Sequence, residues 1–373
     1  MNVPWIRGQV AAQAHVALPA GTVEEEYARE GFFGAYAHLY RRNPPVAWTR
    51  IEGPLRPRAY DTARLEGPSG GDWLASRTPL FENEDARVSM GLLTEPMPWF
   101  FRNADSDELL FVHRGAGRIE TDFGPLAYEP GDYVTIPRGT VYRLAPTSAS
   151  RLLVLETKSA LALPDRGLLG QHALFDPAVL RVPTPGDGTT STPNADGEHE
   201  LRILRAGEVT RVFYPFCPVD TVGWKGTLAP LLLNVRDIRP VTSERYHLPP
   251  PAHATFVTPN VVVCTFLPRP LENGDAAALK VPFYHANIDY DEVLFYHSGD
   301  FFSRTGIRPG MLTLHPQGIH HGPQPGATDR AAKATRTEEV AVMIDTRAPL
   351  RPVVGATHIE EADYWKSWRE PRP

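Results

Sequence analysis

Short apolar runs separated by turn residues fill the chain from about residue 73 to residue 345. Proline and glycine mark the turns, as in residues 130–132 and 137–139. Runs of this kind, bounded by such turn signals, are typical of β-strands. Examples in the first half are residues 89–94, 108–113, 118–122, 133–137 and 151–158. The pattern therefore predicts an all-β protein with a few short helices.

Two segments near the chain ends have a helical pattern instead. Residues 23–30 form a short helical pattern within an extended, proline-rich N-terminal segment. The sequence T-H-I-E-E-A-D-Y-W-K-S-W-R predicts a C-terminal helix, with Thr357 as its N-cap and Glu360 as the capping partner three residues later.

An internal repeat relates the two halves of the chain. Residues 101–115 align with residues 285–299 at a constant offset of 184, and residues 131–142 align with residues 310–321. The repeating unit is too long, and repeated too few times, for a solenoid. The repeat therefore predicts a duplicated β-barrel domain.

The predicted organisation follows from this repeat and from the low apolar content of the segment between the halves. It comprises an N-terminal extended and helical segment (1–60), a first barrel (61–182), a linker or long loop (183–199), a second barrel (200–350), and a C-terminal helix and tail (351–373).

The second half carries a histidine, a glutamate and a histidine at spacings that suit a metal site: His285, Glu292 and His321. Two neutral imidazoles and one carboxylate hold Fe(II) by one face and leave other coordination positions open. Residues two apart share a face of a strand, so a bulge or turn across residues 288–290 is needed to bring Glu292 to the same side as His285. Asp291 is the alternative acidic ligand.

The repeated blocks resemble the two motifs of the cupin superfamily, whose barrels are small antiparallel jelly rolls. Glu292-x6-Gly299 and Gly310-x5-Pro316-x-Gly318-x2-His321 match fully in the second half. The first half keeps Glu108 and the glycines but has Phe101 and Tyr142 at the ligand positions. The resemblance implies a bicupin with one metal-binding barrel and one barrel without metal.

A narrower resemblance is to the homogentisate 1,2-dioxygenase family. It is carried by P-F-Y-H-A-N at residues 282–287, by His315 and His321-Gly-Pro, by residues 213–226 and by A-V-M-I-D-T at residues 341–346. The resemblance implies Fe(II)-dependent opening of the ring of homogentisate or a related para-diphenol by O2, which gives maleylacetoacetate in aromatic amino-acid (tyrosine) catabolism.

The same resemblance suggests roles for residues around the metal. His247 and His315 are the candidate proton acceptors for the substrate hydroxyl, since an imidazole titrates near neutral pH. His253 is the alternative to His247 in the same proline-rich connection. Tyr284 and Asp345 are candidate pocket residues that contact the substrate.

Other expectations follow from bulk composition. The 373 residues carry a net charge of −6, so the composition does not indicate a basic surface for binding nucleic acid. No apolar run is long enough to cross a membrane, and the first ten residues lack a secretory pattern. Cys217 and Cys264 lie in apolar segments, as free thiols of a cytoplasmic protein do. A homo-oligomer is compatible with the sequence.

Two rival functions are consistent with the same residues. One is a ring-cleaving dioxygenase for gentisate or a substituted hydroquinone. The other is a non-catalytic, metal-binding bicupin. The side chains of the pocket wall decide between substrates, and the sequence alone does not identify them.

Overall fold

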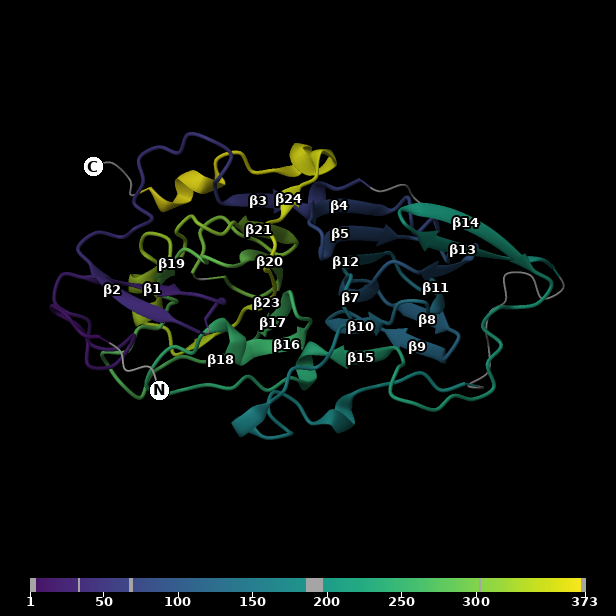
Figure 1. Ribbon diagram of the computed structural model, residues 1–373, viewed down its shortest axis with the longest axis horizontal. Coiled ribbons are helices and arrows are strands. Elements are labelled where there is room, and N and C mark those ends of the chain that lie inside the picture. The colour runs from purple at the N-terminus through teal and green to yellow at the C-terminus, as the bar shows by residue number, and fades with distance from the viewer. Residues whose placement is uncertain (1–4, 33, 67–69, 186–196, 302, 370–373) are drawn as a thin grey trace.

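The computed structural model describes residues 5–32, 34–66, 70–185, 197–301 and 303–369. Their regular secondary structure is almost entirely β-strand, arranged in two barrels side by side (Figure 1). The structure confirms the predicted all-β fold with a duplicated barrel. Most of the predicted linker, residues 186–196, lies outside the described residues.

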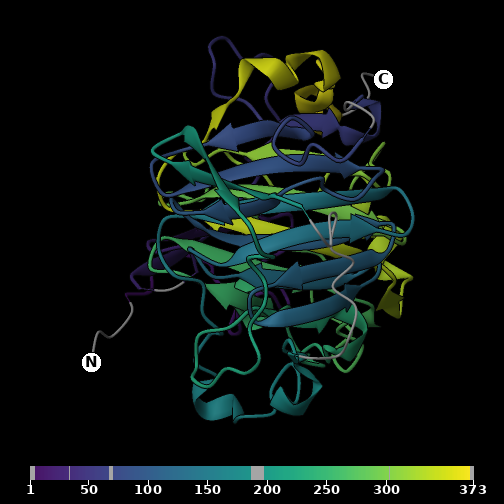
Figure 2. The same cartoon turned by 90° about the vertical axis from the view of Figure 1, so that its right-hand side faces the viewer.

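The first barrel is built from two sheets, whose strands are stacked across the barrel in Figure 2. The seven-stranded sheet has the order β15 (Leu231–Asn234), β10 (Asp132–Ile136), β7 (Asp107–Arg114), β12 (Ser150–Thr157), β5 (Ala86–Leu93), β4 (Arg77–Glu82) and β24 (Arg351–Pro352). The six-stranded sheet has the order β14 (Glu208–Tyr214), β13 (His199–Arg205), β6 (Phe100–Asn103), β11 (Val141–Pro146), β8 (Gly117–Thr121) and β9 (Gly124–Tyr128).

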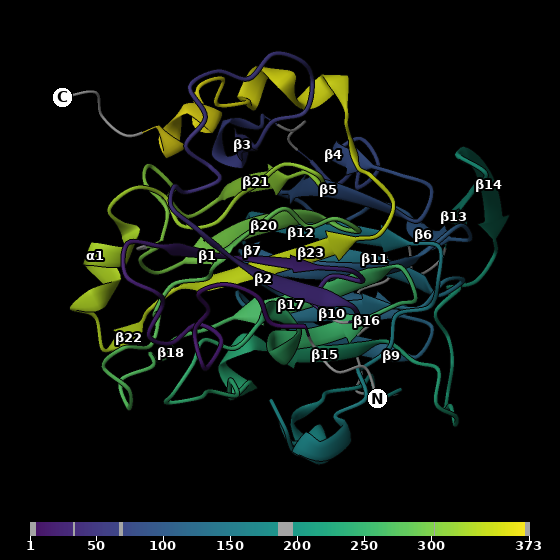
Figure 3. The ribbon, with the colours of Figure 1, turned by 60° about the vertical axis from the view of Figure 1, so that its left-hand side comes forward.

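The second barrel has one large sheet and two small ones. The large sheet has the order β16 (Ala254–Val257), β17 (Val261–Phe266), β23 (Val340–Thr346), β20 (Asp291–Ser298), β21 (Met311–His315) and β3 (Arg58–Asp61). The small sheets are β19 (Tyr284–His285) with β1 (Val23–Ala28) and β2 (Tyr36–Arg41), and β18 (Arg269–Pro270) with β22 (Arg336–Thr337). Figure 3 shows the β1–β2 hairpin lying in front of this barrel.

The two halves exchange strands. In each half, four strands of the large sheet follow the same order: β10-β7-β12-β5 in the first and β21-β20-β23-β17 in the second. Next to β10 lies β15, from the second half of the sequence, and next to β21 lies β3, from the N-terminal segment. Sheet membership therefore does not follow the predicted domain bounds.

The large sheets of the two barrels pack against each other and share one hydrophobic core. Equivalent residues of the repeat meet there: the rings of Phe111 and Phe295 are 6.3 Å apart, and the Nδ1 atoms of His113 and His297 are 3.0 Å apart. The apolar faces of both sheets are buried in this way, which favours one fixed arrangement of the barrels.

The predicted helix at residues 23–30 is wrong, because this segment forms strand β1. Glutamates favour a helix in isolation, but tertiary contacts override that preference. Strand β1 pairs antiparallel with β2 and parallel with β19. Its buried Glu24 and Glu25 bind side chains of neighbouring strands and loops, including His38 and His320.

The C-terminal helix is also not formed as predicted. The segment makes two separate 3₁₀ turns, η6 (Val354–Ile359) and η7 (Tyr364–Trp368). Between them, the Glu360 carboxylate binds Arg58, and the Glu361 N–H donates to the carbonyl of Ala59 in β3. These bonds to strand β3 replace the bonds that a continuous helix would make.

The other helices are short. They are α1 (Ala327–Ala332) and the 3₁₀ turns η1 (Thr62–Arg64), η2 (Gly167–Leu169), η3 (Pro177–Val179), η4 (Val235–Asp237) and η5 (Pro250–His253). None of the helices in the described part of the chain has the length and apolar character needed to cross a membrane.

Candidate functional site

The two candidate histidine ligands lie directly opposite each other in the second barrel. The His285 N–H donates to the His321 carbonyl (3.1 Å), and the His321 N–H donates to the His285 carbonyl (2.8 Å). Their rings are 4.2 Å apart. The equivalent residues of the first barrel, Phe101 and Tyr142, pair in the same way. The same backbone pairing therefore brings the two positions together in both halves of the repeat.

The glutamate reaches the histidines through a turn. Strand β19 ends at His285, the chain turns across residues 288–289, and β20 starts at Asp291. Asn287 has a positive φ of 42°, a conformation that asparagine adopts more readily than most residues. The turn required by the sequence is present, and it brings Glu292 to the side of His285.

The imidazole rings are oriented for metal binding. The Nδ1 of His285 donates to the carbonyl of Phe283 (3.0 Å), and the Nδ1 of His321 donates to the carbonyl of Ile319 (3.2 Å). Because a carbonyl only accepts, the proton of each ring lies on Nδ1, and Nε2 carries the lone pair that can bind a metal. These Nε2 atoms lie 3.9 and 3.8 Å from Oε2 of Glu292. Nε2 of His321 also accepts a long hydrogen bond from the side-chain amide of Asn287 (3.4 Å).

The burial and the incomplete hydrogen bonding of this cluster suit the binding of a metal ion. All three side chains are buried, and their potential ligand atoms lie within 4.8 Å of one another. The Nε2 of His285 has no hydrogen-bond partner, which is costly for a buried nitrogen unless a ligand binds it. Burial and the neighbouring His285 lower the pKa of His321 to about 3, so its imidazole is neutral, as metal binding requires.

His315 holds the other oxygen of the glutamate. Its Nδ1 lies 2.6 Å from Oε1 of Glu292, and its Nε2 lies 3.0 Å from the hydroxyl of Tyr364. Burial raises the pKa of Glu292, but hydrogen bonds to the three histidines outweigh it and hold that pKa well below its usual range. His315 is fully buried and does not line the cavity described below. This position orients the carboxylate and does not suit the predicted contact with substrate.

The alternative ligands face elsewhere. Asp291 lies on the opposite face of β20, where its carboxylate accepts from the backbone N–H groups of Gln317 and Leu350, both at 2.7 Å. His320 points away from the barrel, with its Nε2 2.7 Å from Oε1 of Glu25.

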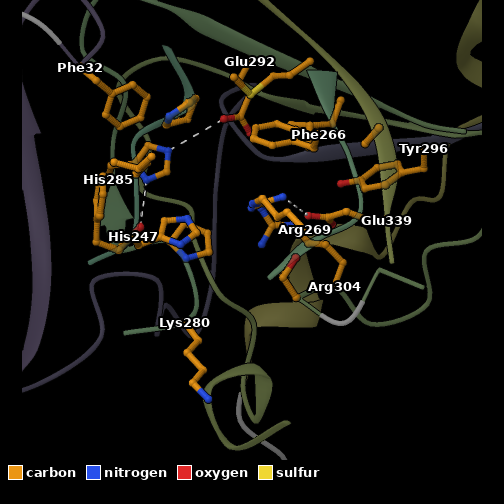
Figure 4. A pocket seen from close by; sticks show the side chains of 18 residues that line it. Phe32, His247, Phe266, Arg269, Lys280, His285, Glu292, Tyr296, Arg304 and Glu339 are labelled. Carbon is orange, nitrogen blue, oxygen red and sulfur yellow. Dashed lines mark hydrogen bonds and ion pairs between the residues drawn. The ribbon is translucent and has the colours of Figure 1, made fainter. Parts of the chain in front are cut away.

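A cavity opens beside the candidate metal site (Figure 4). It encloses about 820 Å³, including the space at its mouth. His285 and Glu292 form part of its wall. Much of the remaining wall is apolar: Phe32, Leu248, Pro250, Phe266, Pro282, Phe283, Leu294, Ala341 and Met343. A cavity with an apolar wall and several convergent polar groups suits a small aromatic ligand that carries polar substituents.

His247 is the predicted proton acceptor that lines this cavity. Its Nδ1 lies 3.2 Å from Oε1 of the buried Glu272, which is within ion-pair distance but without a hydrogen bond. His253 lies behind it and does not line the cavity. Burial and the nearby Arg269 lower the pKa of His253 to about 3.

The two other predicted substrate contacts also lie outside the cavity wall. Tyr284 packs among the apolar residues around Tyr296 and Trp368. Asp345 is the cross-strand partner of Glu292, and its Oδ1 is buried without a hydrogen bond. Burial, reinforced by the charge of Glu292, raises the pKa of Asp345 well above its usual range.

Several residues that support the site were missed from the sequence. The C-terminal segment supplies Tyr364, which contacts His315, and Trp368, whose Nε1 donates to the carbonyl of Gly322 at 3.1 Å. Arg304 lines the cavity and donates to the same carbonyl at 2.6 Å. The aromatic residues of the C-terminal segment were the available signal, because aromatic residues in a predicted terminal helix need a surface to pack against.

The first barrel carries a guanidinium at the position equivalent to the metal site. Nη1 of Arg77 lies 2.6 Å from Oε1 of Glu108, the repeat equivalent of Glu292. The hydroxyl of Tyr142 donates to the other Glu108 oxygen (2.8 Å) and accepts from Nη2 of Arg77 (2.8 Å). Arg77 also lies over the ring of Trp73, 4.4 Å from its centroid. This arrangement fills the barrel that the sequence predicts to lack metal.

A second cluster of two histidines and a glutamate lies in the N-terminal segment. The Nδ1 atoms of His15 and His38 lie 2.7 and 2.9 Å from the two carboxylate oxygens of Glu24. Hydrogen bonds from both histidines lower the pKa of Glu24 to about 2 against the opposing effect of burial. Each of these groups already has a partner, in contrast to His285, so the cluster is a satisfied hydrogen-bond network.

Sequence comparisons relate the chain to dioxygenases. The family model described as "Homogentisate 1,2-dioxygenase N-terminal" matches residues 82–235. A protein of Saccharolobus solfataricus, whose name assigns it provisionally to the dioxygenases, is 33% identical over 364 residues. That match covers 92% of this chain and 92% of the relative.

Named homogentisate 1,2-dioxygenases are more distant. Those of Bradyrhizobium diazoefficiens and Rhizobium leguminosarum are 27% and 28% identical, each over 72% of this chain. The matched region spans 62% of the length of those proteins.

Among solved structures, a cupin 2 conserved barrel domain protein from Leptotrichia buccalis covers 78% of this chain, and the match spans 96% of that protein. The sequence identity is 9% and the TM-score is 0.38.

Proposed function

The chain belongs to the homogentisate 1,2-dioxygenase family, and on that premise we propose that it is an Fe(II)-dependent enzyme that opens the ring of homogentisate or a closely related para-diphenol with O2. One observation carries the proposal. Two Nε2 atoms and one carboxylate oxygen converge in a buried cluster at the wall of a partly apolar cavity.

The donor set suits iron rather than a structural metal. His285, Glu292 and His321 supply three ligands, and a closed structural site would take a fourth from the protein. Two histidines and one carboxylate are the donors typical of non-haem Fe(II) oxygenases. Bound Fe(II) would supply the electron transfer that activates O2 and would favour the ionised form of a phenol bound beside it.

The protein itself positions the metal ligands and the substrate ring. His315 holds one oxygen of Glu292, and the carbonyls of Phe283 and Ile319 hold the imidazoles of His285 and His321. These contacts keep the ligand atoms oriented before a metal binds, which is how outer contacts support metal affinity. The apolar wall, including Phe32, Phe266 and Phe283, then holds an aromatic ring beside the ligands and excludes water.

His247 is the group that we propose accepts the proton of the substrate hydroxyl. It lines the cavity, and the Glu272 carboxylate beside its Nδ1 stabilises the imidazolium that proton transfer creates. This arrangement resembles the base-and-carboxylate pairs of other enzymes, in which the carboxylate also fixes the ring.

The proposal is tested by supplying labelled oxygen to the iron-loaded protein. Protein with Fe(II) is mixed anaerobically with homogentisate, gentisate or hydroquinone and then exposed to ¹⁸O2. We expect O2 uptake equal to the homogentisate consumed, and a ring-opened product that carries both labelled atoms. Uptake with gentisate alone would reassign the substrate. The absence of uptake with all three would favour a non-catalytic bicupin.

A further inference from the structure

Three cationic side chains line the cavity, and two of them already have partners. Lys280 donates from its ammonium to Asn273 Oδ1 (2.9 Å) and to the carbonyls of Ala334 (3.0 Å) and Ala332 (3.3 Å). Figure 4 shows its ammonium directed away from the other labelled side chains. Nη1 of Arg269 lies 3.6 Å from Oε1 of Glu339. Neither charge requires a ligand.

Arg304 differs from both. Its Nη1 donates to the carbonyl of Gly322 (2.6 Å), but its Nε is buried without a hydrogen-bond partner. Within the described ranges, no carboxylate lies within ion-pair distance of this guanidinium. A buried donor without a partner is costly, and the cost is greater when the donor carries charge. Because Arg304 lines the cavity, an anion bound there would supply the missing partner.

The metal ligands do not provide that anion. Glu292 lines the same cavity, but both of its oxygens face histidines. A cation bound at His285, Glu292 and His321 would neutralise the glutamate further, so Arg304 would still lack a counter-charge. Planar guanidinium groups bind carboxylates through two parallel hydrogen bonds, which suits the edge that carries Nε.

We propose that Arg304 binds the side-chain carboxylate of the aromatic substrate in the cavity. This inference rests on the proposed function, and it narrows the substrate to a diphenol that carries a carboxylate, in preference to a neutral hydroquinone. Arg304 thereby fixes the end of the substrate that does not react, and the hydroxyls are directed toward His285 and His247.

A purely structural role for Arg304 predicts different behaviour. The carbonyl that Arg304 holds belongs to Gly322, next to the ligand His321, and it also accepts from Trp368. If Arg304 only supported this backbone, its loss would weaken metal binding and would affect charged and neutral ligands equally. A variant that loses affinity for the carboxylic acid but not for its uncharged ester has lost a contact with the charge. A comparison of the two ligands therefore separates substrate binding by Arg304 from a structural role.

The test measures anaerobic binding by calorimetry, with iron-free and with Fe(II)-loaded protein. The probes are 2,5-dihydroxyphenylacetate and its methyl ester. The variants are Arg304→Gln and Arg304→Lys, and the matched control is Arg336→Gln, which removes an exposed arginine of β22. Iron content is measured for every variant, so that a damaged metal site is recognised separately.

We expect the wild-type protein to bind the acid more tightly than the ester, and Arg304→Gln to lose roughly 10- to 100-fold affinity for the acid alone. Arg304→Lys should recover part of that loss, and Arg336→Gln should behave as wild type. Equal binding of acid and ester by the wild-type protein, or an equal loss of both in Arg304→Gln, would overturn the proposal. Because binding is measured without O2, an inactive protein that still discriminates would contradict only the proposed reaction.

Discussion

At the scale of single residues, the site depends on which nitrogen of each imidazole carries the proton. Backbone carbonyls hold Nδ1 of His285 and of His321, so both Nε2 atoms face Glu292. Nothing in the side-chain types alone sets this tautomer. It follows from the strand geometry, which places each ring beside a carbonyl two residues earlier in the chain.

Replacing His321 with alanine should abolish stoichiometric iron binding, because one of three ligands is lost. His320→Ala is the matched control: the neighbouring histidine binds Glu25 and points away from the site. Iron content after anaerobic loading and desalting measures both variants. Full iron content in His321→Ala would show that the ligand set is different.

Replacing His247 with glutamine should leave iron content unchanged and lower turnover by roughly 10²- to 10⁴-fold, the range expected for loss of a general base. The side chain lines the cavity but is not among the candidate ligands. Steady-state O2 uptake with the preferred diphenol measures the effect. A near-normal rate would move the proton-accepting role to another group.

At the scale of elements, the repeat explains what could be predicted and what could not. The paired blocks predict two barrels, and the spacing of Glu292 from His285 predicts the turn between them. The repeated sequence blocks do not predict that β3 and β15 join the sheet of the other half, because pairing between distant strands is set by tertiary packing. The same holds for β1, whose glutamates favour a helix until His38 and His320 bind them.

The roles of side chains were less predictable than their positions. His315 was expected to contact substrate, yet a hydrogen bond to Glu292 holds it in the interior. Arg304, which has no motif around it, lines the cavity because the loop after β20 returns to the barrel. Contacts of this kind depend on loop conformations, for which hydrophobic patterns carry no information.

The ion pair between Arg77 and Glu108 in the first barrel allows a prediction about stability at this scale. Arg77→Met leaves the carboxylate of Glu108 buried without its cation, and should lower the free energy of unfolding by about 3–5 kcal/mol. Urea denaturation measures the loss. Because this barrel is predicted to lack metal, the iron content of the folded variant should equal that of wild type.

The double variant Arg77→Met/Glu108→Gln is the control for this experiment. Removing both charges should restore part of the stability, since no unpaired charge is left in the barrel. A single variant as stable as wild type would show that the guanidinium does not act as the counter-charge of Glu108.

At the scale of the whole molecule, the two barrels meet at a pair of equivalent histidines. Burial, the other histidine and the nearby Arg114 and Arg151 lower the pKa of His113 to about 3. Burial and Arg114 lower the pKa of His297 to about 4. Both are therefore neutral in the folded protein at pH values where the unfolded chain, with a histidine pKa near 6.5, is protonated.

This difference makes stability depend on pH. Between about pH 6.5 and pH 4 the unfolded state binds more protons at these positions, so the stability that they contribute is present above pH 6.5 and is lost as the pH falls. The double variant His113→Gln/His297→Gln should show a smaller decrease of the melting temperature over this window than wild type. Identical slopes would show that the interface between the barrels is not pH-sensitive through this pair.

The central claim is that His285, Glu292 and His321 bind a ferrous ion beside the cavity. Anomalous diffraction at the iron edge, from crystals loaded anaerobically with Fe(II), tests it most directly. We predict one strong peak, between Nε2 of His285, Nε2 of His321 and the carboxylate of Glu292. A peak at His15, Glu24 and His38 in its place, or none at the predicted ligands, would contradict the account.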